Sequence, residues 1–172
     1  MANLEPQEAD VWYVCYCEPK RALPLTRELA ETGHMVECPS FQFRRRLPRK
    51  AKTELIERAL IGGMFFCRID SWPLQGGVAA GISLELVRRL IWLGEPAVVT
   101  DEDLAGLRLA GRARTDSKTQ FAVGDAVSVD FGPFKGARAR ITELRSKRFV
   151  VEVEGLSIPM EIPPFLLGKN QA

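Results

Sequence analysis

The fold of this chain is decided by residues 123–141, which read VGDAVSVDFGPFKGARARI. A glycine and an aspartate open the stretch, and two valines then alternate with small or polar residues. This period of two places Val127 and Val129 on the same face of a strand. Gly132 and Pro133 interrupt the pattern, and both residue types favour turns. The stretch therefore predicts two short strands joined by a tight turn.

The same β-type pattern continues to the end of the chain. Strands are expected over residues 126–131, 137–144, 147–154 and 156–162, with turns between them. Four or five short strands in about fifty residues are typical of a small antiparallel barrel. The C-terminal part is therefore predicted to be a separate all-β domain that covers residues 121–169.

The preceding segment has a different composition. Residues 110–120 read AGRARTDSKTQ and contain no large apolar side chain. Such a segment has nothing to bury in a core, so it is predicted to be a flexible linker. The chain is thus expected to divide into an N-terminal domain over residues 11–109, a linker over 110–120 and the C-terminal domain.

The N-terminal domain is expected to open with a central strand. Residues 12–17 read WYVCYC, and both alternating faces of this segment are apolar. One face would carry Trp12, Val14 and Tyr16, and the other would carry the two cysteines. A helix should follow over residues 20–32, since apolar residues recur there at helical spacing and a glycine ends the pattern.

Three further elements complete the prediction for this domain. Residues 61–69, IGGMFFCRI, form the most apolar stretch and read as a core strand, and the two glycines imply a bend or a close backbone approach. Ser83 is expected to cap a short helix that ends at Leu90. Thr100 is expected to cap a last helix whose first turn holds three acidic residues. The fold class is therefore α+β, an antiparallel sheet with helices followed by a small β-barrel.

A basic segment lies between two of these strands. It contains six cations and no acid over residues 41–52, namely Arg44, Arg45, Arg46, Arg49, Lys50 and Lys52. A cluster of this kind can neutralise several phosphates of a nucleic acid, although a solvated basic arm is the simpler alternative.

Composition excludes several classes of function. The chain has 172 residues and a net charge of only +2, so it lacks the global positive field of a nucleic-acid coating protein. It has one histidine, His34, and four cysteines whose spacing does not fit a zinc site. No nucleophile with a base, no phosphate loop and no membrane span is visible. We therefore expect a cytoplasmic, monomeric protein that is not an enzyme and holds no cofactor or metal.

Residues 123–141 resemble the KOW motif, and the whole order of elements resembles the NusG/RfaH family of transcription elongation and antitermination factors. Trp12 and Tyr13 match the opening of the family's N-terminal domain, the NGN domain, and WYVCYC is similar to the RfaH-type paralogues. Two positions depart from the family pattern. Ala139 stands where a second glycine is usual, and residues 61–64 replace the usual Phe-Pro-Gly-Tyr or Phe-Pro-Asn-Tyr. The chain is therefore interpreted as a divergent paralogue with an NGN-like domain and an SH3-like KOW barrel.

The resemblance implies partners and site residues. The NGN-like domain is expected to bind the clamp helices of the largest subunit of bacterial RNA polymerase through Tyr16, Ile61, Met64 and Phe65. The basic segment would lie near upstream or non-template DNA. The KOW domain would recruit a small-subunit ribosomal protein or the termination factor Rho through Phe134 and Ile162. In some paralogues the KOW domain also switches fold, but Pro159, Pro163 and Pro164 disfavour a helix there.

Two alternatives share parts of this pattern. A ribosome-associated, RNA-binding KOW protein would be strongly basic, whereas this chain is nearly neutral. A phage inhibitor or antiterminator would use the same docking site with another outcome. The sign of the effect on pausing or termination and the recruitment sequence stay open at this point.

Overall fold

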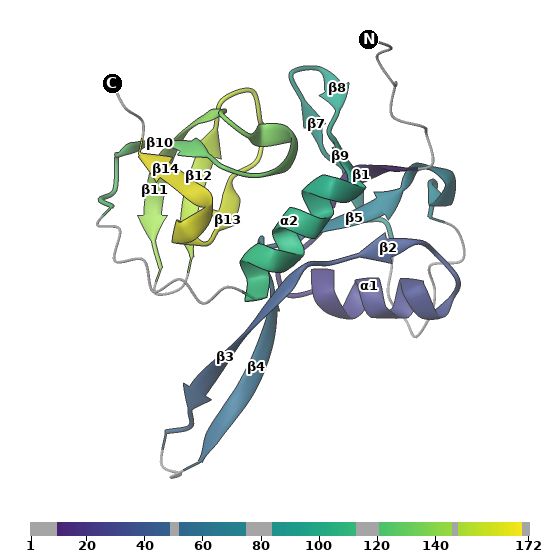
Figure 1. Ribbon diagram of the computed structural model, residues 1–172, viewed down its shortest axis with the longest axis horizontal. Helices are drawn as coiled ribbons and strands as arrows, with labels where there is room; N and C mark the ends of the chain where they lie inside the picture. The colour runs from purple at the N-terminus through teal and green to yellow at the C-terminus, as the bar shows by residue number, and fades with distance from the viewer. Residues whose placement is uncertain (1–9, 49–51, 75–83, 113–120, 146–147, 170–172) are drawn as a thin grey trace.

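The computed structural model describes residues 10–48, 52–74, 84–112, 121–145 and 148–169. Figure 1 shows two groups of elements side by side, with a long two-stranded arm extending away from both. Below, the N-terminal module means the described residues up to 112, and the C-terminal module means residues 121–169.

A five-stranded antiparallel sheet forms the centre of the N-terminal module. Its strands are β1 (Val11–Tyr16), β2 (Val36–Glu37), β5 (Met64–Arg68), β6 (Arg88–Arg89) and β9 (Val98–Thr100). Strand β1 is central, with β5 on one side and with β6 and β9 along the other. The predicted central position of residues 12–17 is thus confirmed.

The two faces of β1 enter two different hydrophobic clusters. Cys15 and Cys17 pack with helix α1 (Ala22–Glu31), whose buried residues are Ala22, Leu25, Thr26 and Leu29. Trp12 and Val14 belong to the second cluster, which also contains buried residues of the C-terminal module. The alternation predicted for this strand is therefore confirmed, and it explains why both faces are apolar.

Helix α2 (Asp101–Arg112) starts at the predicted cap. The backbone N–H of Asp103 donates to Oγ1 of Thr100 at 3.2 Å, and the N–H of Thr100 donates to Oδ2 of Asp103 at 3.0 Å. This reciprocal pair is a capping box. Leu104 and Leu107 are the buried residues of the helix. The helix continues to Arg112, so the predicted linker begins later than residue 110.

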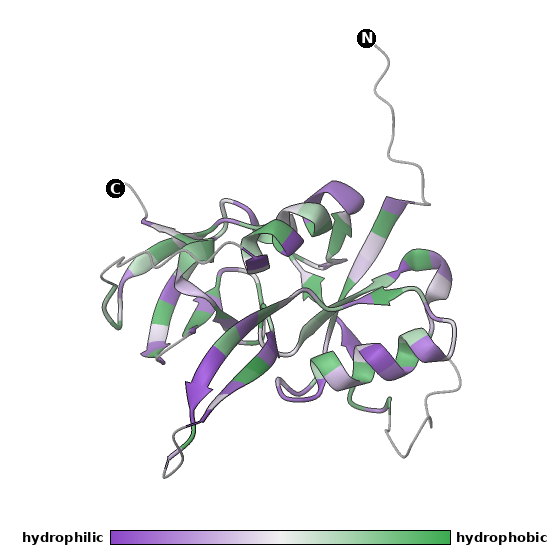
Figure 2. Ribbon diagram, turned by 60° about the horizontal axis from the view of Figure 1, so that its bottom comes forward, coloured by the Kyte–Doolittle hydropathy of each residue, from purple (hydrophilic) through white to green (hydrophobic). Residues whose placement is uncertain are grey.

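The arm is a hairpin of β3 (Ser40–Arg46) and β4 (Thr53–Ala59). These two strands form a sheet of their own. At its base, the N–H of Leu60 donates to the carbonyl of Pro39 at 2.6 Å. Figure 2 shows the hydrophilic colouring concentrated toward the far end of β3.

The C-terminal module is a second five-stranded antiparallel sheet. Its strands are β10 (Ala126–Val129), β11 (Arg138–Leu144), β12 (Phe149–Val153), β13 (Met160–Ile162) and β14 (Leu167–Lys169), in the order β13-β12-β11-β10-β14. The short 3-10 helix η4 (Gly132–Phe134) joins β10 to β11, and η5 (Pro164–Leu166) precedes β14. The hairpin expected from residues 123–141 is thus present. The predicted α+β class is confirmed.

The helix expected from Ser83 to Leu90 is wrong over its described part. Leu84 to Val87 form a turn, and β6 follows. The reason is the free edge of β1, which offers backbone partners to this segment. Cys15 pairs with Arg89, and the N–H of Leu90 donates to the carbonyl of Val14 at 2.8 Å. A helix of two turns is only marginally stable by itself, so strand pairing prevails.

Three small elements remain. Residues 69–71 form the 3-10 helix η2 (Ile69–Ser71) after β5. The strands β7 (Ile91–Trp92) and β8 (Glu95–Pro96) pair as a short hairpin that extends toward the C-terminal module. Leu93 and Gly94 form its turn, with φ angles of 53° and 88°. A two-residue turn with two positive φ angles matches the twist of a hairpin, although a leucine rarely adopts the first position.

Candidate functional site

Three predicted contact residues lie where the two modules meet, namely Tyr16 at the end of β1, Met64 at the start of β5 and Ile61 just before β5. Tyr16 and Met64 are partners in the β1–β5 register. Ile61 and Met64 are 3% and 2% exposed, and Tyr16 is half-buried. All three pack in the cluster that includes Met160 and Ile162 of the C-terminal module. The C-terminal module therefore covers the surface that the resemblance assigns to RNA polymerase.

Two glycines permit this close approach. The N–H of Gly62 donates to the carbonyl of Glu161 at 2.9 Å, and a Cβ atom at Gly62 would lie 2.7 Å from the Cβ of Glu161. Gly63 has a φ of 77°, and a Cβ there would lie 2.5 Å from the carbonyl oxygen of Cys17. Any larger side chain at position 62 would push the modules apart. The close backbone approach predicted for these glycines is confirmed.

Arg148 makes a buried polar contact between the modules. It precedes β12, is 7% exposed, and donates through Nη2 to the backbone carbonyl of Ala59 at the base of the arm. Its Nη1 lies 3.5 Å from Oε2 of Glu161, and its guanidinium carbon lies 5.5 Å from the ring centre of Phe41. Burial lowers the pKa of Arg148, and Glu161 opposes this effect by raising it. The bond to Ala59 and the contact with Phe41 join the two modules, whereas Glu161 belongs to the same module as Arg148 and balances its charge there.

The β7–β8 hairpin makes a second contact. The indole N–H of Trp92 donates to the carbonyl of Glu154 at 3.0 Å, and the indole ring stands edge-on to Phe134 with the ring centres 5.3 Å apart. Leu93 follows Trp92 in the turn, and a Cβ at Gly155 would lie 2.5 Å from its Cδ2. Aromatic pairs in this geometry are favourable beyond the apolar area that they bury. The hairpin therefore gives the C-terminal module a second contact with the N-terminal module, separate from that of Arg148.

Three of the predicted contact residues are core residues in this arrangement. Phe65 is fully buried among the residues beneath α1, on the face of the sheet away from the C-terminal module. Phe134 and Ile162 are also fully buried, and Phe134 lies between Trp92 and Phe131. A partner could touch these side chains only after the surrounding residues move.

The basic arm presents its cations unequally. Arg44 and Arg46 lie on the same face of the hairpin as Leu55, and within the described part of the chain neither has an ion-pair partner. Arg45 lies on the other face, 3.5 Å from its cross-strand neighbour Glu54. Lys52 is exposed, whereas Arg49 and Lys50 lie outside the described residues. The arm therefore carries a face with unneutralised arginines at its far end.

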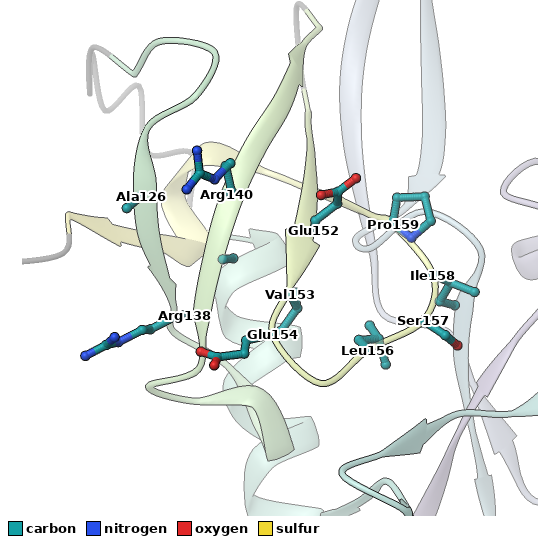
Figure 3. A pocket seen from close by; sticks show the side chains of 11 residues that line it. Ala126, Arg138, Arg140, Glu152, Val153, Glu154, Leu156, Ser157, Ile158 and Pro159 are labelled. Carbon is teal, nitrogen blue, oxygen red and sulfur yellow. The ribbon is translucent and has the colours of Figure 1, made fainter.

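An open groove of about 610 Å³ runs over the outer face of the C-terminal sheet (Figure 3). Arg138 and Arg140 of β11 line it together with Glu152 and Glu154 of β12, and the loop with Leu156 curves along its side. Arg140 and Glu152 are cross-strand neighbours. Because two cations face two carboxylates, the groove has no excess charge of either sign.

The cysteines show no sign of reactivity. Burial raises the pKa of the Cys17 thiol to about 11 and those of Cys38 and Cys67 to about 12. Thiols of this kind stay protonated at neutral pH and are poor nucleophiles. Within the described ranges, no three His, Cys, Asp or Glu side chains come together as metal ligands. His34 is half-buried beside Thr32 at the end of α1. No helix in the same ranges is long and apolar enough to span a membrane.

The contacts between the modules were missed by sequence reasoning. Arg148 lies in a stretch of sequence rich in charged residues, RSKR over residues 145–148. Nothing in that pattern indicates that its side chain is buried. Trp92 did give a signal, because a large aromatic residue next to a Leu-Gly turn is unusual for a solvent-exposed hairpin tip.

Comparison with protein-family models and with curated proteins found no match. Among solved structures, one titled "Domain interaction in Thermotoga maritima NusG" aligns with 96% of this chain and 100% of its own, at 19% identity and a TM-score of 0.37. The MjSpt4:Spt5 complex aligns in conformation B with 91% of this chain and 94% of its own, at 14% identity and a TM-score of 0.30. Conformation A aligns with 92% and 99%, at 16% identity and a TM-score of 0.26. Values this low do not establish a function.

Proposed function

We propose that this protein is a transcription elongation factor of the NusG/RfaH kind that binds bacterial RNA polymerase and changes its pausing or termination. The N-terminal module acts as the NGN-like domain and the C-terminal module as the KOW domain, joined by a linker that starts after α2. The polymerase surface is formed by Tyr16, Ile61 and Met64. The KOW domain then recruits a second partner, either a small-subunit ribosomal protein or Rho.

One observation carries the proposal. The apolar surface at Tyr16, Ile61 and Met64 is covered by a module that follows it in the chain, through apolar packing and a small set of hydrogen bonds. When the C-terminal module moves away from the N-terminal module, this apolar surface becomes exposed and can serve as a docking site. The coiled-coil clamp helices of the polymerase are a partner of fitting chemistry, since an apolar stripe with polar flanks lies along such a helix.

The basic arm supports the same proposal. It extends from the module that carries the apolar surface (Figure 1), so a polymerase bound there would place its DNA within reach of the arm. Arginines without acidic partners are well suited to the phosphates of that DNA.

Single-round transcription by purified bacterial RNA polymerase tests the proposal. A template with one pause site and one terminator is transcribed with and without the protein. The proposal expects altered dwell time at the pause or altered read-through at the terminator. If neither changes and the protein does not bind the polymerase, this function is wrong.

Replacing Tyr16 with alanine should weaken polymerase binding by about tenfold, because a central aromatic side chain of an interface contributes on the order of 1–2 kcal/mol. Tyr13 to alanine is the matched control, since Tyr13 lies on the other face of β1 and contacts Arg89 and Trp72. Surface plasmon resonance with immobilised polymerase gives both affinities. Equal losses in the two variants would contradict the assignment of Tyr16.

Removing Arg44 and Arg46 together should weaken binding to a DNA-containing elongation complex and lower its dependence on salt. The slope of log affinity against log salt should fall by about 0.9 for each lost phosphate contact. Arg45 to alanine should change the slope less, because Glu54 already partners this arginine. An unchanged slope in the double variant would show that the arm is a solvated hairpin without a DNA contact.

A further inference from the structure

A second cleft, of about 600 Å³, lies between the two modules and carries an excess of positive charge. The N-terminal module contributes residues at the start of α1 and along β4. The C-terminal module contributes Arg145, which follows β11, Arg148, which precedes β12, and Glu161 of β13. Five cations line it, namely Lys20, Arg27, Arg58, Arg145 and Arg148, against two carboxylates, Glu57 and Glu161. The lining therefore has a formal charge of +3, in contrast to the balanced groove of the C-terminal sheet.

On the side of the N-terminal module, the carboxylates do not use up the hydrogen-bond donors of the cations. Lys20 has no ion pair within the described part of the chain, and Arg27 uses only Nη2, which lies 2.6 Å from Oε2 of Glu57. The guanidinium of Arg58 lies over the ring of Phe43 at 5.3 Å, and stacking leaves the N–H groups on the guanidinium edge free. On the C-terminal side, Nε, Nη1 and Nη2 of Arg145 already bond to Glu143 or Glu161, and the Nε of Arg148 is buried out of a ligand's reach. A ligand in the cleft would therefore meet unused donors on Lys20, Arg27 and Arg58, while Arg145 and Arg148 contribute their positive charge.

The start of α1 adds to the same field. The helix begins without a side-chain cap, and its first turn contains no acidic residue. The N-terminal N–H groups of a helix carry a partial positive charge that favours anions. Lys20 precedes this turn and Leu23 and Pro24 belong to it, and all three line the cleft. The positive electrostatic field of the N-terminal end of α1 therefore adds to that of the cations that line the cleft.

Apolar side chains form the rest of the wall. Leu23, Pro24, Ile56 and Ala59 line the cleft beside the cations. A volume of this size suits a ligand as large as a nucleotide, and an apolar wall suits its base or sugar. Arginine forks match phosphate oxygens in geometry, and a phosphate carries more charge than a carboxylate.

We propose that this cleft binds the phosphate group of a nucleotide and that the bound nucleotide bridges the two modules. The phosphate contacts Lys20, Arg27 and Arg58 from one side, and Arg145 and Arg148 form the opposite wall. Because the complete cleft exists only when the modules are together, the ligand stabilises the closed arrangement. This inference does not rest on the polymerase proposal, since the ligand needs no polymerase to bind.

Isothermal titration of the full-length protein with adenosine 5′-monophosphate and with adenosine tests the site. The monophosphate should bind and adenosine should not. Lys20 to alanine and Arg58 to alanine should each weaken binding by about tenfold, because each removes a charge-assisted contact. Lys135 to alanine is the matched control, since Lys135 is exposed and lies outside the cleft. A 5′-phosphorylated oligothymidylate, compared with its dephosphorylated form, shows whether a strand end supplies the phosphate instead.

Hydrogen exchange tests the bridging role separately. The amide of Gly62 bonds to Glu161 across the modules, so its exchange reports their separation. Saturating monophosphate should slow this exchange in the wild type and leave it unchanged in the Lys20 variant. The inference is wrong if neither phosphate source binds, if the Lys20 and Arg58 variants bind like the control, or if binding leaves Gly62 exchange unaltered. Each of these results leaves the transcription assay free to succeed or fail by itself.

Discussion

Replacing Arg148 with methionine is expected to favour separation of the two modules. The change removes the bond to the carbonyl of Ala59, the ion pair with Glu161 and the contact over Phe41. Of these, only the bond to Ala59 and the contact over Phe41 cross between the modules, and losing a buried hydrogen bond from a charged donor costs up to about 3 kcal/mol. Methionine keeps much of the volume of the arginine stem. Glu161 still has Arg145 as a partner at 2.5 Å, so no buried carboxylate is left alone. The closed arrangement should therefore lose stability while each module stays folded.

Amide exchange at Gly62 measures this opening. A loss of about 3 kcal/mol corresponds to exchange that is about a hundredfold faster, provided that the amide exchanges through separation of the modules. Arg145 to methionine is the control, because Arg145 is an exposed residue whose ion pairs are screened by solvent. The Arg145 change should alter the exchange rate of the Gly62 amide only slightly. Similar exchange in wild type and in the Arg148 variant would show that Arg148 does not hold the modules together.

Replacing Phe134 with alanine should lower the free energy of unfolding of the C-terminal module by about 3–5 kcal/mol. Phe134 is fully buried and stands edge-on to both Trp92 and Phe131, so the change leaves a cavity and also removes the clasp of the β7–β8 hairpin. Urea denaturation followed by circular dichroism gives the loss.

The control for this change is Phe121 to alanine. Phe121 is half-buried and stands edge-on to Phe149 at 5.8 Å, so its removal should cost much less. If the Phe134 variant kept wild-type stability and lost only the binding of a partner, Phe134 would be a contact residue as the resemblance implies, and its burial would be irrelevant.

Local patterns predicted most elements of the fold. The alternation in residues 12–17 assigned both faces of β1 correctly, since a strand covered on both sides must be apolar on both. Thr100 with three following acids located the start of α2, because the cap bonds lie within one turn. The glycines at positions 62 and 63 indicated a close approach before its partner, Glu161, could be known.

Features that depend on distant residues were not predicted. Residues 84–90 form a turn and a strand because the edge of β1 was free, and no local pattern records that edge. The burial of Arg148 depends on Phe41 and Ala59, which are far away in the sequence. Likewise, Tyr16, Ile61 and Met64 could be recognised as an apolar surface, but not as one covered by the C-terminal module. Long-range packing decides such features, and local propensity does not contain them.

The central claim is that the surface under the C-terminal module binds RNA polymerase. The most direct test is the equilibrium affinity of purified bacterial RNA polymerase for the wild-type chain and for the Arg148→Met variant, measured side by side. If the modules must separate before the protein binds, its apparent affinity is the intrinsic affinity multiplied by the fraction of molecules in the open state. The variant has a larger open fraction, so it should bind more tightly, by up to about a hundredfold. Equal affinities, or no binding by either protein, would contradict the claim.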